Sequence, residues 1–346
     1  MAPIKQNIPL APLTTFDIGG NARFFVEVST VYELAEAIKF ANDKKLAVFV
    51  LGGGSNILIS DEGFNGLVVK MDISGITLMN TPIPGSRAKH TMGHSGWRIR
   101  AGAGEIWDDI VAKAVELNVS GIENLSLIPG TVGGAVYQNI GAYGAELKDV
   151  LISMQAYDIK TGSIVELSNK ECGFEYRSSI FKKNKDLIIL EAELLLSEDN
   201  KPNLLYPDLK NRFKGQNPSV AQIRDAVIEI RMSKIPYPNE VRNTGSFFKN
   251  PTVKNSNYKF LISKYPDLKG YNTDNGLVKL SAAQLIERAG FKGRRVGNVG
   301  VSAKHALVLV NYGSGTAKEL NDLVERVKEA VEAKFSVKLE AEVENI

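Results

Sequence analysis

The sequence predicts an α+β protein of two or three domains. Its 346 residues are more than one ordinary hydrophobic core organises, and apolar residues occur both at helical and at strand-like spacing. Hydrophobic residues make up 44% and charged residues 23% of the chain, as is typical of a soluble globular protein. A third observation is a stretch rich in glycine and other small residues, Ile128–Gly144, IPGTVGGAVYQNIGAYG. We expect the rest of the chain to be organised around it.

The Ile128–Gly144 stretch offers few side chains that could fill a core. Glycine has no Cβ, so this backbone can press its N–H groups against a ligand. Consecutive N–H groups in such turns form concave nests that hold anions, phosphates above all. A tight structural turn is the alternative, and it would explain a single Gly-Gly pair. Because LGGGSN at Leu51–Asn56 has the same character, we expect the two loops to hold the diphosphate of a dinucleotide-like cofactor.

The N-terminal part predicts a strand–helix–strand unit. A short strand at Phe24–Val28 precedes apolar residues at helical spacing, with Ser29 and Thr30 as candidate caps. A second strand, Leu46–Leu51, runs directly into the first glycine run. That run is neither G-x-G-x-x-G opening a helix nor G-x-x-x-x-G-K-[ST], so the Rossmann and Walker interpretations are both weak.

The next segment, Ile73–Arg100, contains several prolines and glycines and predicts a strand pair joined by a long loop. His90 and His94 lie in it four residues apart, but no helical pattern surrounds them and no carboxylate or cysteine completes a set. We therefore expect no metal site. Ala101–Glu105, AGAGE, is a third glycine-rich turn, and it opens a helix with one apolar face. Such a helix start also favours phosphate.

Beyond the central stretch, two strands at Leu151–Asp158 and Ser163–Leu167 flank a Thr-Gly turn, and an apolar strand follows at Leu187–Leu196. Ser197–Gln216 is polar and contains two prolines, which indicates a mobile, irregular loop.

The C-terminal third predicts helices and one buried strand. Prolines follow the helix at Val220–Arg231. The helices at Ser281–Ala289 and Thr316–Phe335 both begin with a capping box, and Leu307–Val310 is the strand.

Three polar positions are candidates for chemistry. Ser246 lies in NTGSFFKNP, Arg177 lies in FEYRSSIFK, and Glu342 lies on the polar face of the alternating segment Ser336–Glu344, which predicts a terminal strand. Each has an ordinary structural interpretation: a serine that closes a turn, an interdomain ion pair and a solvated carboxylate. Spacing alone assigns none of them a catalytic role.

Charge and cysteine content exclude several classes of protein. The formal net charge is +3 and the basic residues are scattered, so we expect no nucleic-acid binding. Cys172 has no second cysteine to pair with, which fits a reducing cytoplasm, and we interpret it as a buried, inert thiol. The N-terminal residues lack the pattern of a signal peptide, and no apolar run is long enough to span a bilayer. We expect a cytoplasmic protein without membrane insertion.

Eight segments occur together in one order: LGGGSN, GAGE, IPGTVGGAVYQNIGAYG, FEYRSSIFK, RMSKIP, GSFFKNP, SAAQLIERAGFKG and LEAEVE. Together they resemble the UDP-N-acetylenolpyruvoylglucosamine reductase family, flavoenzymes that complete UDP-N-acetylmuramate in peptidoglycan synthesis. The resemblance runs from TTFDIGGNARFF to Glu342. GAGE alone is a weak signal, whereas GSFFKNP and PGTVGGA with QNIGAYG are specific.

The resemblance implies an FAD-binding fold of the vanillyl-alcohol-oxidase type with a separate substrate-binding domain. Residues 1–75 with 336–346 would form an N-terminal FAD-binding domain completed by the C-terminal strand, 76–219 a second FAD-binding domain and 220–335 the substrate-binding domain. The residues implied to hold FAD without a covalent bond are Gly52, Gly53, Gly54, Ser55, Asn56, Pro129, Gly130, Thr131, Gly133, Gly134, Ala135, Asn139, Gly141 and Gly144.

The family's reaction joins the three polar candidates in one mechanism. NADPH supplies hydride through the flavin to the enolpyruvyl group of a nucleotide sugar, which leaves negative charge beside a carboxylate. Arg177 would stabilise that charge, Ser246 would donate the proton, and Glu342 would share the acid work or orient the enolate. Glu342 must be protonated to donate, so we expect burial to raise its pKa.

The resemblance also implies residues that bind the nucleotide sugar. Lys234 and Asn250 match positions that contact the diphosphate, and Tyr206 matches a tyrosine that closes over the substrate in the family's long subfamily. Pro207 departs from the commoner glycine after that tyrosine and would stiffen the turn. We expect a monomer.

Two other functions stay open at this stage. One is an oxidase of the same FAD fold that acts on a sugar or an alcohol, but such enzymes often attach flavin through a His or Cys in the first glycine loop, and Gly52–Asn56 contains neither. The other is a nucleotide-sugar-binding module without turnover, which would have no use for a proton donor.

Overall fold

The computed structural model describes residues 2–82, 95–199, 201–273 and 275–346. The chain divides into two compact units. The first comprises residues 1–7, 23–53 and 65–231, and the second comprises 8–22, 54–64 and 232–346. The first glycine run thus lies at a unit boundary, because Gly53 belongs to the first unit and Gly54 to the second. The three-domain division stays a prediction.

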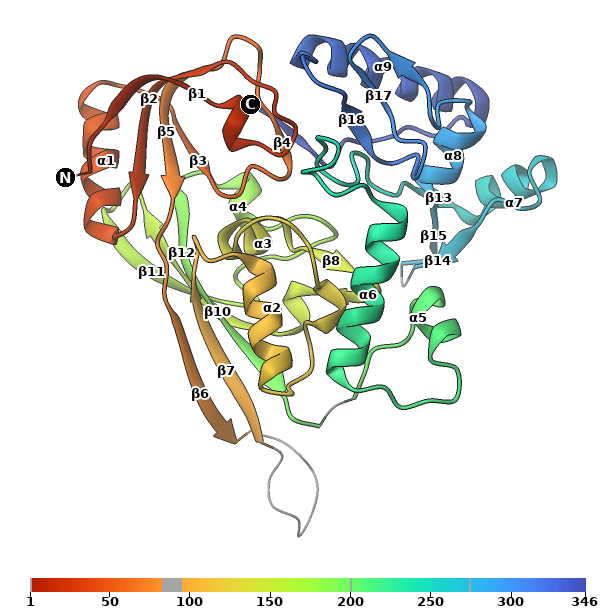
Figure 1. The fold of residues 1–346 in the computed structure, drawn as a ribbon, viewed down its shortest axis with the longest axis horizontal. Helices are drawn as coiled ribbons and strands as arrows, with labels where there is room; N and C mark the ends of the chain where they lie inside the picture. The colour runs from red at the N-terminus through yellow and green to blue at the C-terminus, as the bar shows by residue number, and fades with distance from the viewer. Residues whose placement is uncertain (1, 83–94, 200, 274) are drawn as a thin grey trace. The chain divides into compact units, whose positions relative to one another are not determined.

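A sheet with strand order β1-β2-β5-β3 contains the predicted strand–helix–strand unit (Figure 1). Its helix, α1, begins after Thr30, whose side chain accepts a hydrogen bond from the N–H of Glu33, and Glu33 in turn accepts from the N–H of Ser29. β3 runs parallel to β5, with Leu51 opposite Lys70. The bounds are β1 Lys5–Pro9, β2 Asn21–Val28, α1 Val31–Asp43, β3 Val48–Leu51 and β5 Phe64–Met71, and a short helix η1 spans Ala11–Leu13.

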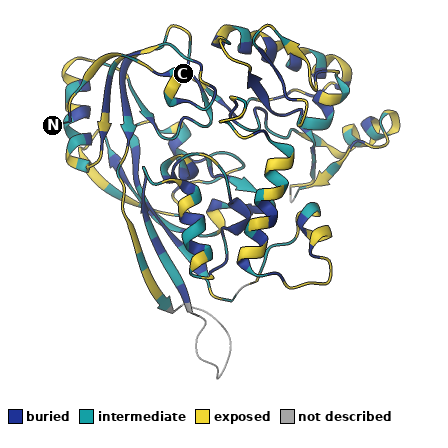
Figure 2. Ribbon diagram, in the orientation of Figure 1, coloured by how far each residue is buried: buried dark blue, intermediate teal, exposed yellow. Residues whose placement is uncertain are grey.

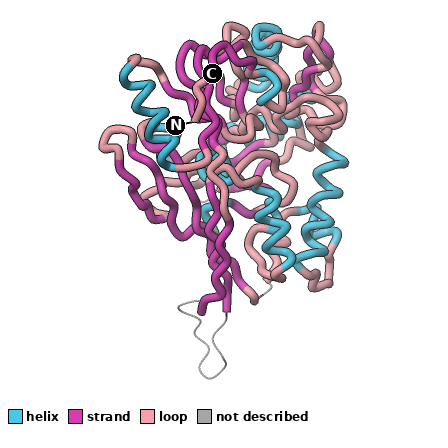
Figure 3. Tube along the Cα trace, turned by 60° about the vertical axis from the view of Figure 1, so that its left-hand side comes forward, coloured by secondary structure: helices cyan, strands magenta, loops and turns pink. Residues whose placement is uncertain are grey.

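An antiparallel sheet with strand order β11-β10-β12-β7-β6 forms the other large part of the first unit (Figure 3). Its β6–β7 pair confirms the predicted strand pair, while His90 and His94 lie outside the described residues. The strands are β6 Ile76–Pro82, β7 Ser95–Gly102, β10 Leu151–Asp158, β11 Ser163–Ser168 and β12 Leu187–Ser197.

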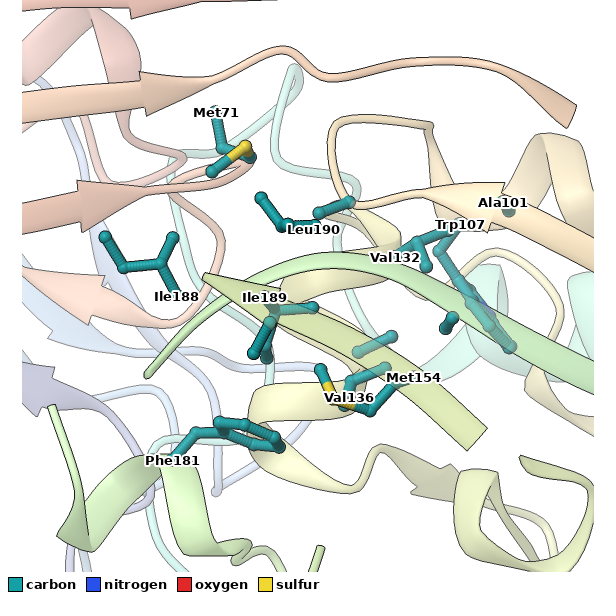
Figure 4. Packing of buried hydrophobic residues seen from close by; sticks show 14 of the residues in the cluster. Met71, Ala101, Trp107, Val132, Val136, Met154, Phe181, Ile188, Ile189 and Leu190 are labelled. Carbon is teal, nitrogen blue, oxygen red and sulfur yellow. The ribbon is translucent and has the colours of Figure 1, made fainter. Parts of the chain in front are cut away.

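Short helices pack on this sheet and close the main core of the first unit. Figure 4 shows Trp107 beside Val132 and Val136 lying close to Met154, all of them buried. The helices are α2 Trp107–Glu116, α3 Val132–Gln138 and α4 Ile180–Lys183, with η2 Glu123–Leu125, η3 Leu147–Asp149, β8 Gly141–Ala142 and β9 Ala145–Glu146 between them. α3 begins within the glycine-rich stretch.

The sequence predicted an irregular loop at Ser197–Gln216, and this was wrong in part. The segment contains helix α5, Pro207–Arg212. Pro207 occupies the first helical turn, where its missing N–H and fixed φ are well tolerated. Leu209 and Phe213 pack against the following helix α6, Val220–Lys234, which extends three residues beyond its predicted end at Arg231.

The second unit has its own buried core, which the apolar stripe of α9 helps to form (Figure 2). Thr316 and Glu319 complete the capping box predicted for α9. Ser281 accepts from the N–H of Gln284, but the Gln284 side chain accepts from Lys269 instead of closing a box. The elements are β4 Ile57–Leu58, β13 Thr252–Lys254, α7 Asn255–Lys264, β14 Gly270–Asn272, β15 Leu277–Leu280, α8 Ala282–Arg288, β16 Arg295–Val296, β17 Val299–Val301, β18 Leu309–Asn311, α9 Ala317–Phe335 and β19 Glu344–Asn345.

Within the described part of the chain, no helix combines the length and the apolar character that crossing a bilayer requires.

Candidate active site

The two glycine runs meet in the first unit. A Cβ on Gly53 would lie 2.7 Å from the Cα of Gly130, and one on Gly52 would lie 2.8 Å from Oγ1 of Thr131. No ordinary side chain fits at such distances, so glycine is what permits the contact. The two loops that the sequence predicts to share one diphosphate are therefore neighbours.

Thr131 carries a hydroxyl that is buried and has no hydrogen-bond partner among the described residues. It precedes α3, but its side chain makes no capping bond. An unpaired buried polar group of this kind costs about 1–3 kcal/mol. Next to it Gly134 is exposed, and the nearest atom to a Cβ there would be Oγ1 of Thr131 at 3.8 Å. An unused hydroxyl beside open, glycine-lined space fits a phosphate oxygen.

Other residues of the second loop serve the packing of the protein. Gly133 donates from its N–H to the carbonyl of Ala103 at 2.9 Å, and a Cβ on Gly133 would lie 3.0 Å from that of Ala103. Ala135 is buried. Gly130 has a φ of +117°, which favours glycine. Close packing explains Gly130 and Gly133, whereas no such contact accounts for Gly134.

Lys70 was not anticipated from the sequence. It lies opposite Leu51 on β5, and its Nζ donates to the carbonyl oxygen of Gly52 at 2.6 Å. Burial lowers the pKa of this ammonium. A cation is thus held directly beneath the first glycine run, where it adds positive potential for an anionic ligand.

Asn139 ends α3 in a left-handed conformation, with φ +47°. Its Nδ2 donates to Glu146 Oε2 at 3.0 Å and to the carbonyl of Glu175 at 3.1 Å, while its Oδ1 accepts from the N–H of Lys148 at 3.1 Å. The side chain is therefore committed to the turn that follows. Its role as a cofactor ligand stays a prediction.

Arg177 lies against the central glycine stretch. It occupies the tip of a tight turn between Glu175 and Ser178, with φ +55°, a conformation unusual for a residue with a side chain. Its guanidinium donates to the carbonyl of Gly141, and a Cβ on Gly141 would lie 2.8 Å from Nη1 of Arg177. The absence of a side chain at Gly141 thus makes room for this cation. Such backbone outliers cluster at functional sites.

Tyr206 is placed next to the same stretch. Its ring contacts that of Tyr143 edge-on, with the centroids 5.0 Å apart and the planes at 79°. Tyr143 and Gly144 both have positive φ, +49° and +86°. Burial raises the pKa of the Tyr143 phenol to about 12, so it stays protonated at neutral pH.

In the second unit, Ser246 begins a short extended segment. It pairs with Val308, and the next residue, Phe247, donates from its N–H to the carbonyl of Leu307 at 2.8 Å. Gly245, with φ +74°, directs the chain into this segment and donates to Oδ1 of Asn243. Phe247 and Phe248 are fully buried. Their burial fixes the backbone that carries the Ser246 hydroxyl.

Glu342 lies beside this segment. Its N–H donates to the carbonyl of Phe247 at 2.7 Å, and its own carbonyl accepts from Nδ2 of Asn56 at 3.1 Å. The residue is 9% exposed, so the predicted solvated face ends before it. The regular strand covers only Glu344–Asn345, which pairs parallel with β4.

The start of the second unit carries the rest of the first glycine run. Gly54, with φ +64°, leaves no room for a side chain, since its Cβ would lie 2.0 Å from the carbonyl oxygen of Leu13. Its carbonyl accepts from the N–H of Thr15 at 3.0 Å. The Thr15 hydroxyl is another buried group without a partner among the described residues. Ser55 follows Gly54, and Asn56 leads into β4.

The residues predicted to contact a substrate diphosphate are also in this unit. Lys234 ends α6. Burial lowers the pKa of His305, and the positive charge of Lys234 lowers it further. Oδ1 of Asn250 accepts from the N–H of Ala282 at 3.0 Å, at the start of α8. Asn250 therefore also has a structural function.

Two further expectations concern metals and thiols. Among the described residues, no group of three or more His, Cys, Asp and Glu side chains could hold a metal ion. Cys172 is buried, and burial raises its pKa to about 11. The thiol is therefore protonated at neutral pH and unreactive.

Two models of known protein families match this chain, one in its N-terminal half and one at its C-terminal end. Residues 22–168 match the family model of an FAD binding domain, and residues 237–346 match that of the C-terminal domain of UDP-N-acetylenolpyruvoylglucosamine reductase. The curated enzyme of that name from Ralstonia nicotianae is 41% identical over 347 residues, covering 99% of both chains. The chain belongs to the UDP-N-acetylenolpyruvoylglucosamine reductase family.

Other members of the reductase family agree. The enzyme from Neisseria meningitidis serogroup A is 39% identical, with 99% of this chain and 97% of that protein covered. The crystal structure of the reductase from Thermus caldophilus superposes with a TM-score of 0.68 at 26% identity, covering 100% of this chain and 99% of that one. The predicted family and the FAD-binding fold are confirmed.

Proposed function

We propose that this chain reduces UDP-N-acetylglucosamine enolpyruvate to UDP-N-acetylmuramate, with NADPH as the hydride donor and non-covalent FAD as cofactor, in peptidoglycan precursor synthesis. The observation that carries the proposal is the 41% identity to the Ralstonia nicotianae reductase over 99% of the chain. This chain contains all three motifs in which Arg177, Ser246 and Glu342 lie.

The FAD diphosphate would be held by the two glycine runs. Gly52 and Gly53 lie against Gly130 and Thr131, and the unpaired Thr131 hydroxyl offers a donor to a phosphate oxygen. Ser55 and Asn56 complete the first run, and Gly141 and Gly144 continue the second. Bound FAD supplies hydride transfer, a chemistry that no amino-acid side chain provides.

Arg177 would bind the carboxylate of the enolpyruvyl group. Reduction of that group leaves negative charge on the carbon beside the carboxylate, and the charge has to be stabilised before a proton arrives. A guanidinium is a permanent cation with planar donors that match a carboxylate. The Gly141 carbonyl orients it in advance, so no reorganisation is needed during the reaction.

Ser246 would hold the proton at Oγ and donate it to that carbon. A serine is a weak acid, and it can act here because the carbanionic carbon is a far stronger base and the donor is preorganised. The burial of Phe247 and Phe248 supplies the preorganisation. Glu342, held by its backbone beside this segment, would share the proton or orient the enolate.

Substrate binding would use Lys234 and Asn250 on the diphosphate, with Tyr206 closing over the nucleotide sugar. Lys234 supplies a point charge. We place the reaction in the cytoplasm and expect a monomer, which size-exclusion chromatography with light scattering would test.

The spectrum of the purified protein tests this function. The purified protein should be yellow, because an oxidised flavin absorbs at about 450 nm. This absorbance should disappear when NADPH is added under anaerobic conditions. The colour should return on adding the enolpyruvyl nucleotide sugar. A protein that NADPH leaves yellow, but that a sugar or an alcohol bleaches and oxygen recolours, would favour the oxidase alternative. A protein without colour changes would favour a binding module.

A further inference from the structure

The turn between β17 and β18 carries a histidine that the proposed mechanism does not use. The two strands pair antiparallel, and the pairing continues into the turn, where the N–H of Ser302 donates to the carbonyl of Val308 at 2.8 Å. His305 lies in this turn, and its carbonyl accepts from the N–H of Val308 at 3.0 Å. Residues 306–308, which follow it, are buried. A titratable side chain thus stands directly before a buried, paired segment.

The imidazole of His305 accepts a hydrogen bond from the backbone. Its Nδ1 accepts from the N–H of Leu307 at 3.2 Å. A ring nitrogen that accepts carries no proton, so this bond assigns the neutral tautomer with the proton on Nε2. Leu307 is 7% exposed, so water does not readily replace the Nδ1 acceptor. The turn keeps this hydrogen bond only while His305 is neutral.

Leu307 also holds the segment that begins at Ser246. Its carbonyl accepts from the N–H of Phe247 at 2.8 Å, and Val308 pairs with Ser246. Leu307 is therefore bonded on both sides, through its N–H to the His305 ring and through its carbonyl to Phe247. Two successive hydrogen bonds thus connect the imidazole to the backbone that carries the Ser246 hydroxyl.

The surroundings of His305 favour its neutral form. Burial lowers the pKa of the imidazole below the ordinary 6.5, the positive charges of Lys234 and Lys292 lower it further, and Glu287 raises it. Lys234 ends α6, Glu287 belongs to α8, and Lys292, beyond α8, pairs with Glu287 at 2.9 Å. The bond to Nδ1 is therefore complete at neutral pH, and it is lost as the pH falls through the folded pKa of His305.

We propose that His305 is a positioning residue for Ser246, and that protonation of its ring in acid loosens the Ser246 segment. The inference rests on the proposed function and adds a pH dependence to the half-reaction that consumes the nucleotide sugar. An imidazolium donates from both nitrogens, so its Nδ1–H would face the N–H of Leu307 and the bond would break. The Ser246 hydroxyl would then lose the alignment that proton donation requires.

Two substitutions of His305 separate the acceptor from the titration. Oδ1 of an asparagine stands as many bonds from Cα as Nδ1 of a histidine does, and asparagine commonly accepts from the N–H two residues ahead. His305→Asn therefore keeps an acceptor for Leu307 that does not titrate. His305→Ala removes the acceptor. Lys304→Gln, whose exposed side chain lies in the same turn, is the control.

Stopped-flow measurement of the two half-reactions tests the proposal. At neutral pH, His305→Ala should be recoloured by the enolpyruvyl nucleotide sugar roughly five- to tenfold more slowly than the wild type, the effect of one neutral hydrogen bond. Bleaching by NADPH should stay within about twofold. His305→Asn and Lys304→Gln should match the wild type. As the pH falls through the pKa of His305, which NMR of its ring protons measures, the wild type should slow roughly five- to tenfold relative to His305→Asn.

A double variant tests whether His305 acts through Ser246. In a Ser246→Ala background, His305→Ala should slow recolouring by less than about twofold, because no hydroxyl is left to position. Full additivity would overturn the inference, since His305 would then act on the reaction by another route.

Hydrogen exchange gives a readout that does not depend on turnover. The Leu307 amide should exchange roughly five- to tenfold faster in His305→Ala than in His305→Asn or the wild type. Equal exchange in the three proteins would contradict the bond to Nδ1.

The outcomes separate this inference from the proposed function. A wild-type protein that the nucleotide sugar fails to recolour overturns the proposed function. When the wild type is recoloured, His305→Ala acting at the wild-type rate overturns the inference alone, and so does equal slowing of both half-reactions, which marks a general structural effect. Loss of rate in acid that is the same in His305→Asn and the wild type also overturns it, because the titrating group then lies elsewhere.

Discussion

The backbone N–H of Glu342 donates to the carbonyl of Phe247 at 2.7 Å, one residue beyond Ser246. Two parts of the chain far apart in sequence are thereby joined beside the predicted proton donor. The bond is between main-chain atoms, so it does not depend on the side chain at either position. Substitutions of the Ser246 and Glu342 side chains therefore test chemistry with the backbone pairing left in place.

Replacing the Glu342 carboxyl should impair only the half-reaction that consumes the nucleotide sugar. We expect Glu342→Gln to slow recolouring by the substrate about 10²-fold, since one positioned acid or donor contributes about that much. Bleaching by NADPH should be unaffected in stopped-flow measurements. Glu340→Gln is the matched control, because that side chain is 77% exposed and pairs with Lys249 at 3.6 Å. Equal slowing in both variants would contradict a specific role.

The Thr131 hydroxyl should strengthen FAD binding, although it lowers the stability of the FAD-free protein. Thr131→Val removes the unpaired hydroxyl, so FAD affinity should fall roughly tenfold while the FAD-free protein becomes no less stable. Thr131→Ser keeps the hydroxyl and should retain affinity. Titration of the FAD-free protein by flavin fluorescence, with thermal unfolding of the same samples, checks both expectations. Unchanged affinity in Thr131→Val would mean that the hydroxyl faces no ligand.

Two glycine-to-alanine variants should behave oppositely. Gly53→Ala places a Cβ 2.7 Å from the Cα of Gly130, so the loops must separate and the unfolding free energy should fall by about 1–3 kcal/mol. Gly134→Ala meets only Oγ1 of Thr131 at 3.8 Å and lies in α3. Alanine should stabilise that helix by about 0.5–1 kcal/mol yet weaken FAD binding. Chemical denaturation without FAD measures the unfolding free energy of both variants. A Gly134→Ala variant less stable than the wild type would contradict the expected opposite behaviour.

Asp108 should make the first unit sensitive to acid. It accepts from both terminal nitrogens of Arg224, each at 2.8 Å, and from the N–H of Leu127 at 2.6 Å. Burial alone would raise its pKa, but the hydrogen bonds from Arg224 and Leu127 and the charge of Arg224 bring it below the ordinary 3.8.

The unfolded chain therefore binds the Asp108 proton more readily, and the stabilisation is present above pH 3.8 and lost as the pH falls through the folded pKa. We expect Asp108→Asn to lower the unfolding free energy by about 3 kcal/mol at neutral pH and to flatten its loss in acid. Asp109→Asn, one residue away and exposed, should change neither. Denaturant titrations between neutral pH and acid decide the question.

The sequence predicted those helices whose ends are fixed by interactions between residues close together in the chain. Periodicity and caps located α1 and α9, because Thr30 and Thr316 satisfy the first N–H groups of their helices directly. α3 was missed, since its glycines disfavour a helix and packing in the core stabilises it instead. α5 was hidden by the prolines of its segment, although Pro207 suits a helix start.

The candidate site was predictable only where motifs carried it. The contact between the two glycine runs followed from their shared composition. Lys70 lies outside those motifs, and its partner Gly52 is distant in sequence, so no local pattern indicated it. The alternation pattern alone predicted a solvated carboxylate at Glu342, and only the resemblance to the family implied its burial. Alternation describes an isolated strand, whereas here the backbone of Glu342 pairs with Phe247 and the residue is buried.

Separate measurement of the two half-reactions in Ser246→Ala tests the assignment of the proton donor most directly. Ser263→Ala, whose hydroxyl donates to the carbonyl of Phe260 within α7, is the control. We predict that bleaching by NADPH proceeds at the wild-type rate, whereas recolouring by the enolpyruvyl nucleotide sugar slows about 10²-fold or more. If both half-reactions slow alike, or if neither does, Ser246 is not the proton donor.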